Sequence, residues 1–178
     1  MKKIFLLLLL TYTVSTLFAQ TKPFIDWANL KNPVYSQPGW STKDACMMYN
    51  DGWFYLYFSA FFYDAGRERS HVVSVRTQDF KTYSEPLFIW SGMEEGWIGL
   101  CSPDISRINN TWILTFNSWG DKEGKPNQLF YATSTDLVRW SGLKPLARNI
   151  TNDVRAIDAA IIPFNKKFTW YGKECRNR

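Results

Sequence analysis

The segment "DACMMYNDGWFYLYFS" (Asp44–Ser59) combines a carboxylate, a short apolar run, a turn at Asn50-Asp51-Gly52 and a second run rich in aromatic residues. Asn, Asp and Gly tolerate the positive φ angles that two-residue hairpin loops need, and aromatic and β-branched residues favour strands. The segment therefore predicts a tight β-hairpin with Asp44 at the head of its first strand.

The same pattern returns twice along the chain, as "CSPDISRINNTWILTFNSW" (101–119) and "AIDAAIIPFNKKFTWYGK" (156–173). Their turns are expected at Asn109-Asn110 and Asn165-Lys166. When the three turns are aligned, Ser102 and Asp158 take the position of Asp44, at successive spacings of 58 and 56 residues.

The segments that link these hairpins repeat as well. "TQDFKTYS" begins at Thr77 and "STDLVRWS" begins 57 residues later, at Ser134. A period near 57 residues, with four short strands in each unit, indicates an all-β protein of the β-propeller type. In the first unit, strands are expected at about 45–49, 54–58, 71–76 and 86–89. Helical repeats are excluded, because no segment of useful length has an apolar period of 3.6 residues.

Residues 1–19 have the pattern of a secretory signal peptide. Two lysines are followed by an apolar run and by small or polar residues up to Ala19. The apolar run is too short to span a bilayer comfortably. We therefore expect an exported protein, periplasmic or extracellular, with no membrane attachment after cleavage; an uncleaved membrane anchor is the alternative.

The composition narrows the range of ligands. Aromatic residues make up 17% of the chain, a load that either fills a large core or lines a surface for ring-shaped ligands. The formal charge is +5 but forms no basic stripe, so nucleic acid is not expected as a partner. Cys46, Cys101 and Cys175 have no metal-type spacing, and no cofactor or metal is expected. Free buried thiols are favoured over a disulfide, which export would permit.

Asp44 and Asp158 are the candidate catalytic residues. In a propeller the first strand of each blade lines the central axis, so residues at equivalent places on first strands converge on one axial pocket. Two carboxylates held apart across a pocket are what glycoside hydrolysis requires. The alternative is a structural role, in which each Asp hydrogen-bonds a neighbouring turn.

Other residues are candidates for substrate binding. Trp40, Trp97 and Trp119 lie near the heads of the blades or just past the inner hairpins, and they are expected either to stack on sugar rings or to pack between blades. Arg155 precedes Asp158 by three residues and could reach a sugar hydroxyl or carboxylate at the rim of the pocket.

The three quoted segments resemble the first three blades of the five-bladed propeller glycosidases, glycoside hydrolase family 43 and its relatives, which include arabinanases, arabinofuranosidases and xylosidases. The resemblance covers about Trp40 to Tyr171. It implies an inverting enzyme in which Asp44 is the general base, while Asp158 orients the general acid and tunes its pKa. Asp104 is two residues out of register, which favours a structural or rim role over a catalytic one, and it is kept as a candidate for substrate binding.

Two departures from the family affect this expectation. Ala45 stands where the family usually has Pro, and the family's general acid is a Glu of the fourth blade. Five blades of this period need about 285 residues, so the 178-residue sequence is expected to be an N-terminal fragment that is inactive by itself. Its expected parts are the signal peptide 1–19 and a partial propeller 20–178, with blades at about 40–97, 98–154 and 155–178; the general acid is expected beyond Arg178.

The expected partner is an oligo- or polysaccharide that contains arabinose or xylose. Two alternatives stay open at this stage. One is a non-catalytic carbohydrate-binding propeller, in which the two Asp residues only accept hydrogen bonds. The other is a related propeller enzyme with a different glycan specificity, such as fructan hydrolysis, although the first blade lacks the Asn-Asp-Pro signature of those enzymes.

Overall fold

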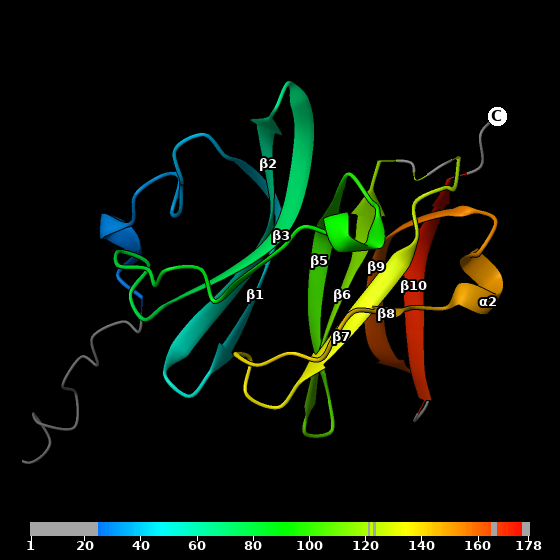
Figure 1. The fold of residues 1–178 in the computed structure, drawn as a ribbon. Coiled ribbons are helices and arrows are strands. Elements are labelled where there is room, and N and C mark those ends of the chain that lie inside the picture. Colours follow the sequence, from blue (N-terminus) through cyan, green and yellow to red (C-terminus); the bar gives the residue numbers. More distant parts are fainter. Residues whose placement is uncertain (1–24, 121, 123, 165–166, 176–178) are drawn as a thin grey trace, which may run out of the picture. The chain divides into compact units, whose positions relative to one another are not determined.

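The computed structural model describes residues 25–120, 122, 124–164 and 167–175 (Figure 1). The chain divides into two compact units, residues 1–30 and 31–178. The described part of the first unit holds a 3-10 helix, η1 (Trp27–Asn29). The predicted signal peptide lies outside the described residues, and no helix within them is long and apolar enough to cross a membrane.

The second unit is built almost entirely from strands. The first blade is an antiparallel set of four, β1 (Ser41–Asn50), β2 (Trp53–Asp64), β3 (Arg67–Thr77) and β4 (Phe88–Trp90). The second blade repeats it with β5 (Gly99–Ile108), β6 (Thr111–Trp119), β7 (Leu129–Ser134) and β8 (Lys144–Pro145). The third begins with the hairpin of β9 (Arg155–Phe164) and β10 (Lys167–Cys175). The predicted partial β-propeller is confirmed.

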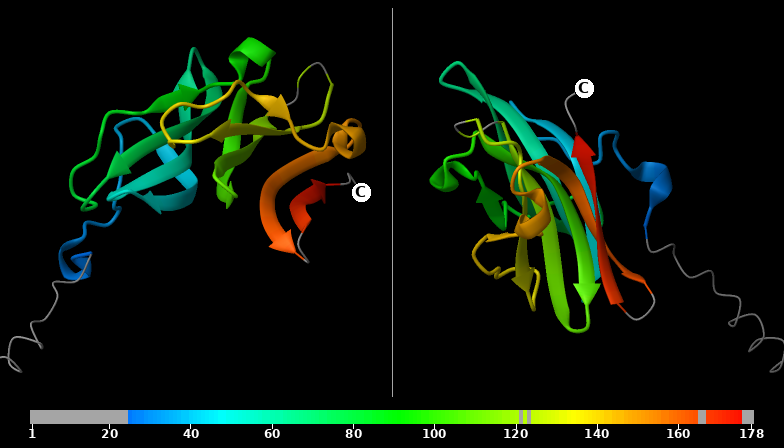
Figure 2. Two further views of the ribbon diagram at one scale, coloured as in Figure 1. Left: turned by 90° about the horizontal axis from the view of Figure 1, so that it is seen from below. Right: turned by 90° about the vertical axis from the view of Figure 1, so that its right-hand side faces the viewer.

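Helices contribute little to the described chain. Besides η1 they are η2 (Met93–Glu95) and α2 (Arg148–Thr151), of three and four residues. Among the first strands of the blades, β5 contacts both β1 and β9 (Figure 2). Residues on these three strands can therefore meet at one place.

The predicted turns form as the sequence indicates wherever they are described. Asn50 pairs with Trp53, and the two loop residues between them have positive φ angles of 50° at Asp51 and 80° at Gly52. Two positive φ angles define a type I′ turn, whose twist suits a β-hairpin. In the second hairpin Asn109 has a φ of 54°. The third predicted turn lies outside the described residues.

The linking repeats also adopt one conformation twice. In the first blade the Thr77 hydroxyl accepts from the backbone N–H of Phe80 at 2.9 Å, and the Asp79 carboxylate accepts from the backbone of Thr82 at 2.9 Å. In the second blade Ser134 and Asp136 make the equivalent bonds to Leu137 and Arg139, at 2.9 and 2.7 Å. The sequence repeat is therefore a structural repeat, in which side-chain oxygens replace backbone partners in a tight loop.

These loops predict a dependence of stability on pH. Backbone N–H groups of Arg139 and Val138 hold the pKa of Asp136 below its usual value. A lowered folded pKa contributes stability above the unfolded pKa of about 3.9, and that stability is lost as the pH falls through the folded pKa. We expect the free energy of unfolding to fall below about pH 4, and to fall less in Asp136→Asn. Urea titrations at pH 7, 4 and 3 measure this; equal pH dependence in both proteins would contradict it.

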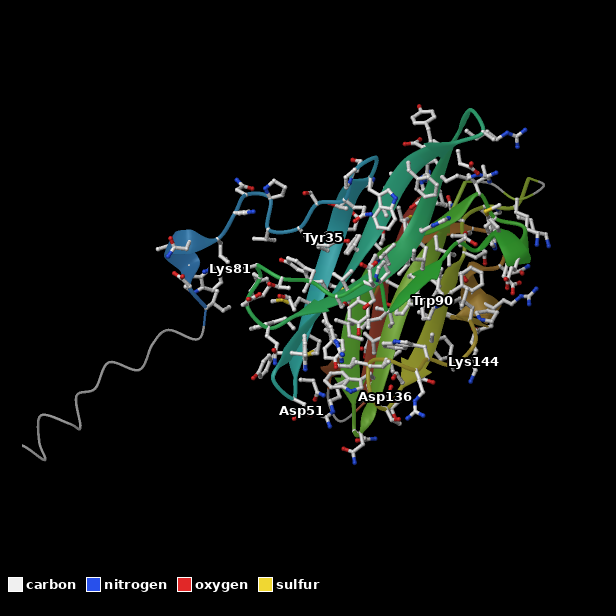
Figure 3. The ribbon with its side chains drawn as sticks, turned by 60° about the vertical axis from the view of Figure 1, so that its left-hand side comes forward. Tyr35, Asp51, Lys81, Trp90, Asp136 and Lys144 are labelled. Atoms are coloured by element: carbon white, nitrogen blue, oxygen red, sulfur yellow. The ribbon has the colours of Figure 1, made fainter. Side chains whose placement is uncertain are left out.

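Aromatic side chains fill the core between the first two blades. Trp90, labelled in Figure 3, stacks on Phe88 with ring centroids 3.9 Å apart. Trp140 meets the edges of this pair and of Tyr57, which is fully buried. The high aromatic content is thus explained in large part by packing between blades, because offset and edge-to-face rings fill such a space well.

Candidate active site

Asp44, Ser102 and Asp158 occupy the same unusual backbone conformation on three successive inner strands. Their φ angles are 53°, 53° and 57°. The pairing of β1 with β2 and of β5 with β6 shifts register around the first two, and the β9–β10 register breaks opposite the third. Each therefore sits in a β-bulge. A left-handed residue other than Gly costs about 1 kcal/mol or more, and bulges often re-aim a side chain next to an active site.

The bulges bring their side chains to one place. Asp44, Ser102 and Asp158 all line a pocket of about 250 Å³, together with Trp119 and Arg155. The same three residues line an adjoining hollow of about 360 Å³. The two predicted catalytic carboxylates, which are 114 residues apart in the sequence, therefore share one pocket.

Asp44 is held in this pocket by a buried hydroxyl. The Ser59 Oγ, on β2, donates to Asp44 Oδ2 at 3.0 Å and accepts from the backbone N–H of Ser102 at 2.8 Å. Ser59 is fully buried, so bulk solvent does not compete for these hydrogen bonds. One hydroxyl thus fixes the carboxylate of the first blade and the bulge of the second.

The second and third blades are joined in the same way. Asn117 stands on β6 where Ser59 stands on β2, and its Oδ1 accepts from the backbone N–H of Asp158 at 3.2 Å. Its amide Nδ2 donates to Ser118 O and Cys101 Sγ, at 3.0 and 3.2 Å. The backbone positions of the second and third bulges therefore each depend on a polar side chain of the preceding blade.

We expect Ser59→Ala to lower the free energy of unfolding by about 1–3 kcal/mol, because the substitution leaves the Ser102 N–H without its acceptor. The exposed Ser41, on the same blade, supplies the matched control Ser41→Ala, which should change stability by less than about 0.5 kcal/mol. Urea denaturation of the three proteins measures the difference. If both variants were as stable as the wild type, Ser59 would not support the bulge.

Asp104 lies in the adjoining hollow with Asp44 and Asp158. It is half-buried, and burial raises the pKa of its carboxyl group. Burial, with the charge of Asp104 as a lesser cause, raises the pKa of the Cys46 thiol to about 12. Cys46 therefore remains a neutral thiol beside this carboxylate.

The described cysteines are free thiols. Cys101 is buried and Cys46 partly buried, and neither forms a disulfide. Burial raises the pKa of Cys101 to about 11. The side chain of Cys175 lies outside the described set.

The remaining tryptophan candidates are not in this pocket. Trp97 is only 7% exposed and packs edge-on against Phe130, with centroids 6.4 Å apart. Trp40 packs near Phe58, with centroids 6.5 Å apart. Of the three tryptophans predicted to stack on sugar rings, only Trp119 lines the pocket of the two carboxylates. There it packs edge-on against Phe61, with ring centroids 5.4 Å apart.

Lys43 and Phe61 are pocket residues that the sequence did not suggest. The Lys43 ammonium lies 4.3 Å from the centroid of the Phe61 ring, and both line the pocket with Asp44. Ser59 and Asn117 were missed as well, although aligning the second strands would place a polar residue after Phe58 and after Phe116 in two otherwise apolar runs.

Among the side chains that the structure describes, no three His, Cys, Asp or Glu residues gather as a metal site would need.

No protein-family model matches this sequence, and no curated protein matches it. Solved structures of glycoside hydrolases do resemble it. A family 117 glycoside hydrolase from Zobellia galactanivorans aligns with a TM-score of 0.61 and 15% identity, over 78% of this chain and 50% of that enzyme. A family 43 β-xylosidase/α-arabinofuranosidase from a compost microbial metagenome gives 0.51 and 21%, over 72% and 41%.

A β-fructofuranosidase of family 32 from Bombyx mori aligns with a TM-score of 0.54 and 11% identity, over 73% of this chain and 28% of that enzyme. The chain thus spans half or less of the length of these enzymes. Because the identities are low, the likeness concerns the fold alone. The chain has the fold of part of a propeller glycoside hydrolase.

Proposed function

We propose that this chain is part of an exported, inverting glycoside hydrolase, similar to family 43, that acts on arabinose- or xylose-containing glycans. The observation that carries the proposal is the shared pocket of Asp44 and Asp158, which come from equivalent bulges of the first and third blades. In an inverting glycosidase the general base and the general acid stand about 6.5–9.5 Å apart, so that a water molecule fits between base and sugar. Asp44 is proposed as the base of such a pair, and Asp158 as a modulator of its acid.

Asp44 is the general base in this proposal. Ser59 donates to one of its carboxylate oxygens, Oδ2. This holds Oδ2 in place, and in the proposal Oδ1 accepts a proton from the attacking water. Asp44 is exposed on the pocket side, so water reaches it. A positioned base contributes about 10²–10⁴-fold to the rate.

Asp158 is proposed to orient the general acid and tune its pKa. Two observations support this: Asn117 accepts from the backbone N–H of Asp158, and the Asp158 side chain lines the same pocket as Asp44. Trp119 and Arg155 line the same pocket and are proposed to bind the sugar, by ring stacking and by hydrogen bonds to hydroxyl groups. Asp104, which is half-buried and lines the adjoining hollow, is proposed to bind substrate without taking part in proton transfer.

The proposed substrate and location follow from the same reasoning. Stacking residues and carboxylates in one pocket suit a carbohydrate, and we propose no role for nucleic acid or a membrane surface. Export to the periplasm or beyond rests on residues 1–19. The similar solved enzymes are named for different sugars, so the choice of arabinose or xylose rests on the sequence resemblance.

A non-catalytic carbohydrate-binding propeller is the second candidate. The observation in its favour is that Asp44 already takes part in a polar cluster, with the Ser102 hydroxyl 3.5 Å from its Oδ2. In that case both carboxylates would serve as acceptors for sugar hydroxyls.

Expression of residues 1–178 tests the division of roles. We expect this polypeptide to hydrolyse neither aryl-arabinofuranosides nor aryl-xylosides, because the described blades provide a base and no placed acid to protonate the leaving oxygen. We also expect it to bind arabinan or arabinoxylan, measured by affinity electrophoresis. Turnover by this polypeptide would show that the acid is already present, and absence of any glycan binding would contradict the proposed function.

A further inference from the structure

The hairpin of β2 and β3 extends past the end of the pocket. β1 begins at Ser41, which pairs with Phe61, so the last three residues of β2 pair only with β3. In Figure 1 this hairpin reaches the top of the view. It forms an arm beside the pocket, since Ser59 and Phe61 at its base touch or line the site.

Tyr63 stands on the pocket face of this arm. Successive residues of a strand point to opposite faces, so Ser59, Phe61 and Tyr63 share one face. The first holds Asp44 and the second lines the pocket, whereas Tyr63 is 79% exposed. A single exposed aromatic residue is ordinary; the distinctive feature is its continuity with the pocket.

The arm is held in shape by its own contacts. The β2–β3 pairing is unbroken from Phe54 opposite Thr77 to Asp64 opposite Arg67. The loop between them, Ala65-Gly66, has φ angles of 49° and 76°, as in a type I′ turn. On the opposite face Phe62 packs edge-on against His71, with ring centroids 4.7 Å apart. Tyr63 is thus presented on a regular ladder, which lowers the entropy lost on binding.

We propose that Tyr63 is a stacking platform for a sugar unit outside the pocket, so that the protein recognises a glycan chain and not a single sugar. This inference rests on the proposed function, because it places the chain in the carboxylate pocket at one end. Tyr63 lies four positions beyond Ser59 along the strand, a distance of about 13 Å. A chain of sugars covers that distance and a monosaccharide does not.

The test is binding of xylo- and arabino-oligosaccharides to residues 1–178, measured by calorimetry with disaccharides and hexasaccharides. We expect Tyr63→Ala to weaken hexasaccharide binding about tenfold, the effect of one lost aromatic contact, and to leave disaccharide binding unchanged, because two sugar units are too short to reach Tyr63 from the pocket. Tyr63→Phe should bind like the wild type, because it keeps the ring. Since the side chain is exposed, all variants should melt at the same temperature.

Tyr49→Ala is the matched control, because Tyr49 is also exposed, at 46%, but lies at the far end of β1. It should bind both oligosaccharides like the wild type. If the wild type binds hexasaccharide and Tyr63→Ala binds it equally well, or if Tyr63→Phe loses as much as Tyr63→Ala, the platform is refuted and the proposed function stands. If the wild type binds neither oligosaccharide, both the stacking role of Tyr63 and the proposed function are contradicted.

Discussion

Asp44→Asn should lower kcat about 10²–10⁴-fold in a protein that joins this chain to the rest of a propeller, with little change in KM. The amide keeps the shape of the carboxylate and can still accept from Ser59, but it cannot take a proton from water. Steady-state kinetics on aryl-arabinofuranosides and aryl-xylosides give both constants. Full activity in Asp44→Asn would show that another group is the base.

Two further substitutions separate the roles in the pocket. Asp158→Asn should lower kcat and move the limb of the pH profile that reports the general acid, because it removes a charge beside that acid. Asp104→Asn should act mainly on substrate binding or folding. Equal pH profiles for Asp158→Asn and the wild type would leave Asp158 without its proposed role.

Among Gly→Ala substitutions at the described glycines, Gly99→Ala should lower the free energy of unfolding most. A Cβ at this position would overlap the backbone oxygen of Ser70 and lie 2.7 Å from its nitrogen. This is the point where the first two blades meet, through a parallel bridge between these residues and the bond from Ser70 Oγ to Leu100 O at 2.8 Å. Backbone atoms cannot move aside as a flexible side chain can, so we expect a loss of about 3 kcal/mol or more.

Gly142→Ala is the control for this prediction. Nothing lies within 4 Å of a Cβ placed there. The change should therefore be neutral or slightly stabilising, by up to about 1 kcal/mol, because Ala restricts the unfolded chain. Urea denaturation of both variants measures the difference. A Gly99→Ala protein as stable as Gly142→Ala would mean that the blades do not meet as described.

The fold could be predicted from the sequence because its signals are local and repeat. A turn such as Asn50-Asp51-Gly52 sets a hairpin by φ preference alone, and the recurrence of the Thr77 loop at Ser134 reports the period. The period then places Asp44 and Asp158 in equivalent positions without any knowledge of tertiary contacts. Their convergence on one pocket follows from the neighbouring inner strands.

The details of the site could not be predicted, because they depend on contacts between blades. Ser59 supports Asp44 only because the bulge of the second blade presents the Ser102 N–H to the same hydroxyl. Trp97 and Trp119 are indistinguishable by residue type, yet the former is buried against Phe130 and only the latter reaches the pocket. Whether a given tryptophan is buried or reaches the pocket is decided by the twist and packing of whole sheets.

The most direct test of the proposed chemistry is an NMR measurement of the product released from an aryl-arabinofuranoside or aryl-xyloside by the whole protein. We predict hydrolysis of at least one of them, with the first sugar product in the inverted anomeric configuration, and loss of that reaction in Asp44→Asn. Binding of arabinan or arabinoxylan without hydrolysis would contradict the proposed enzymatic activity and favour the non-catalytic carbohydrate-binding propeller. Hydrolysis with retention would require Asp44 to act as a nucleophile and would contradict its role as general base.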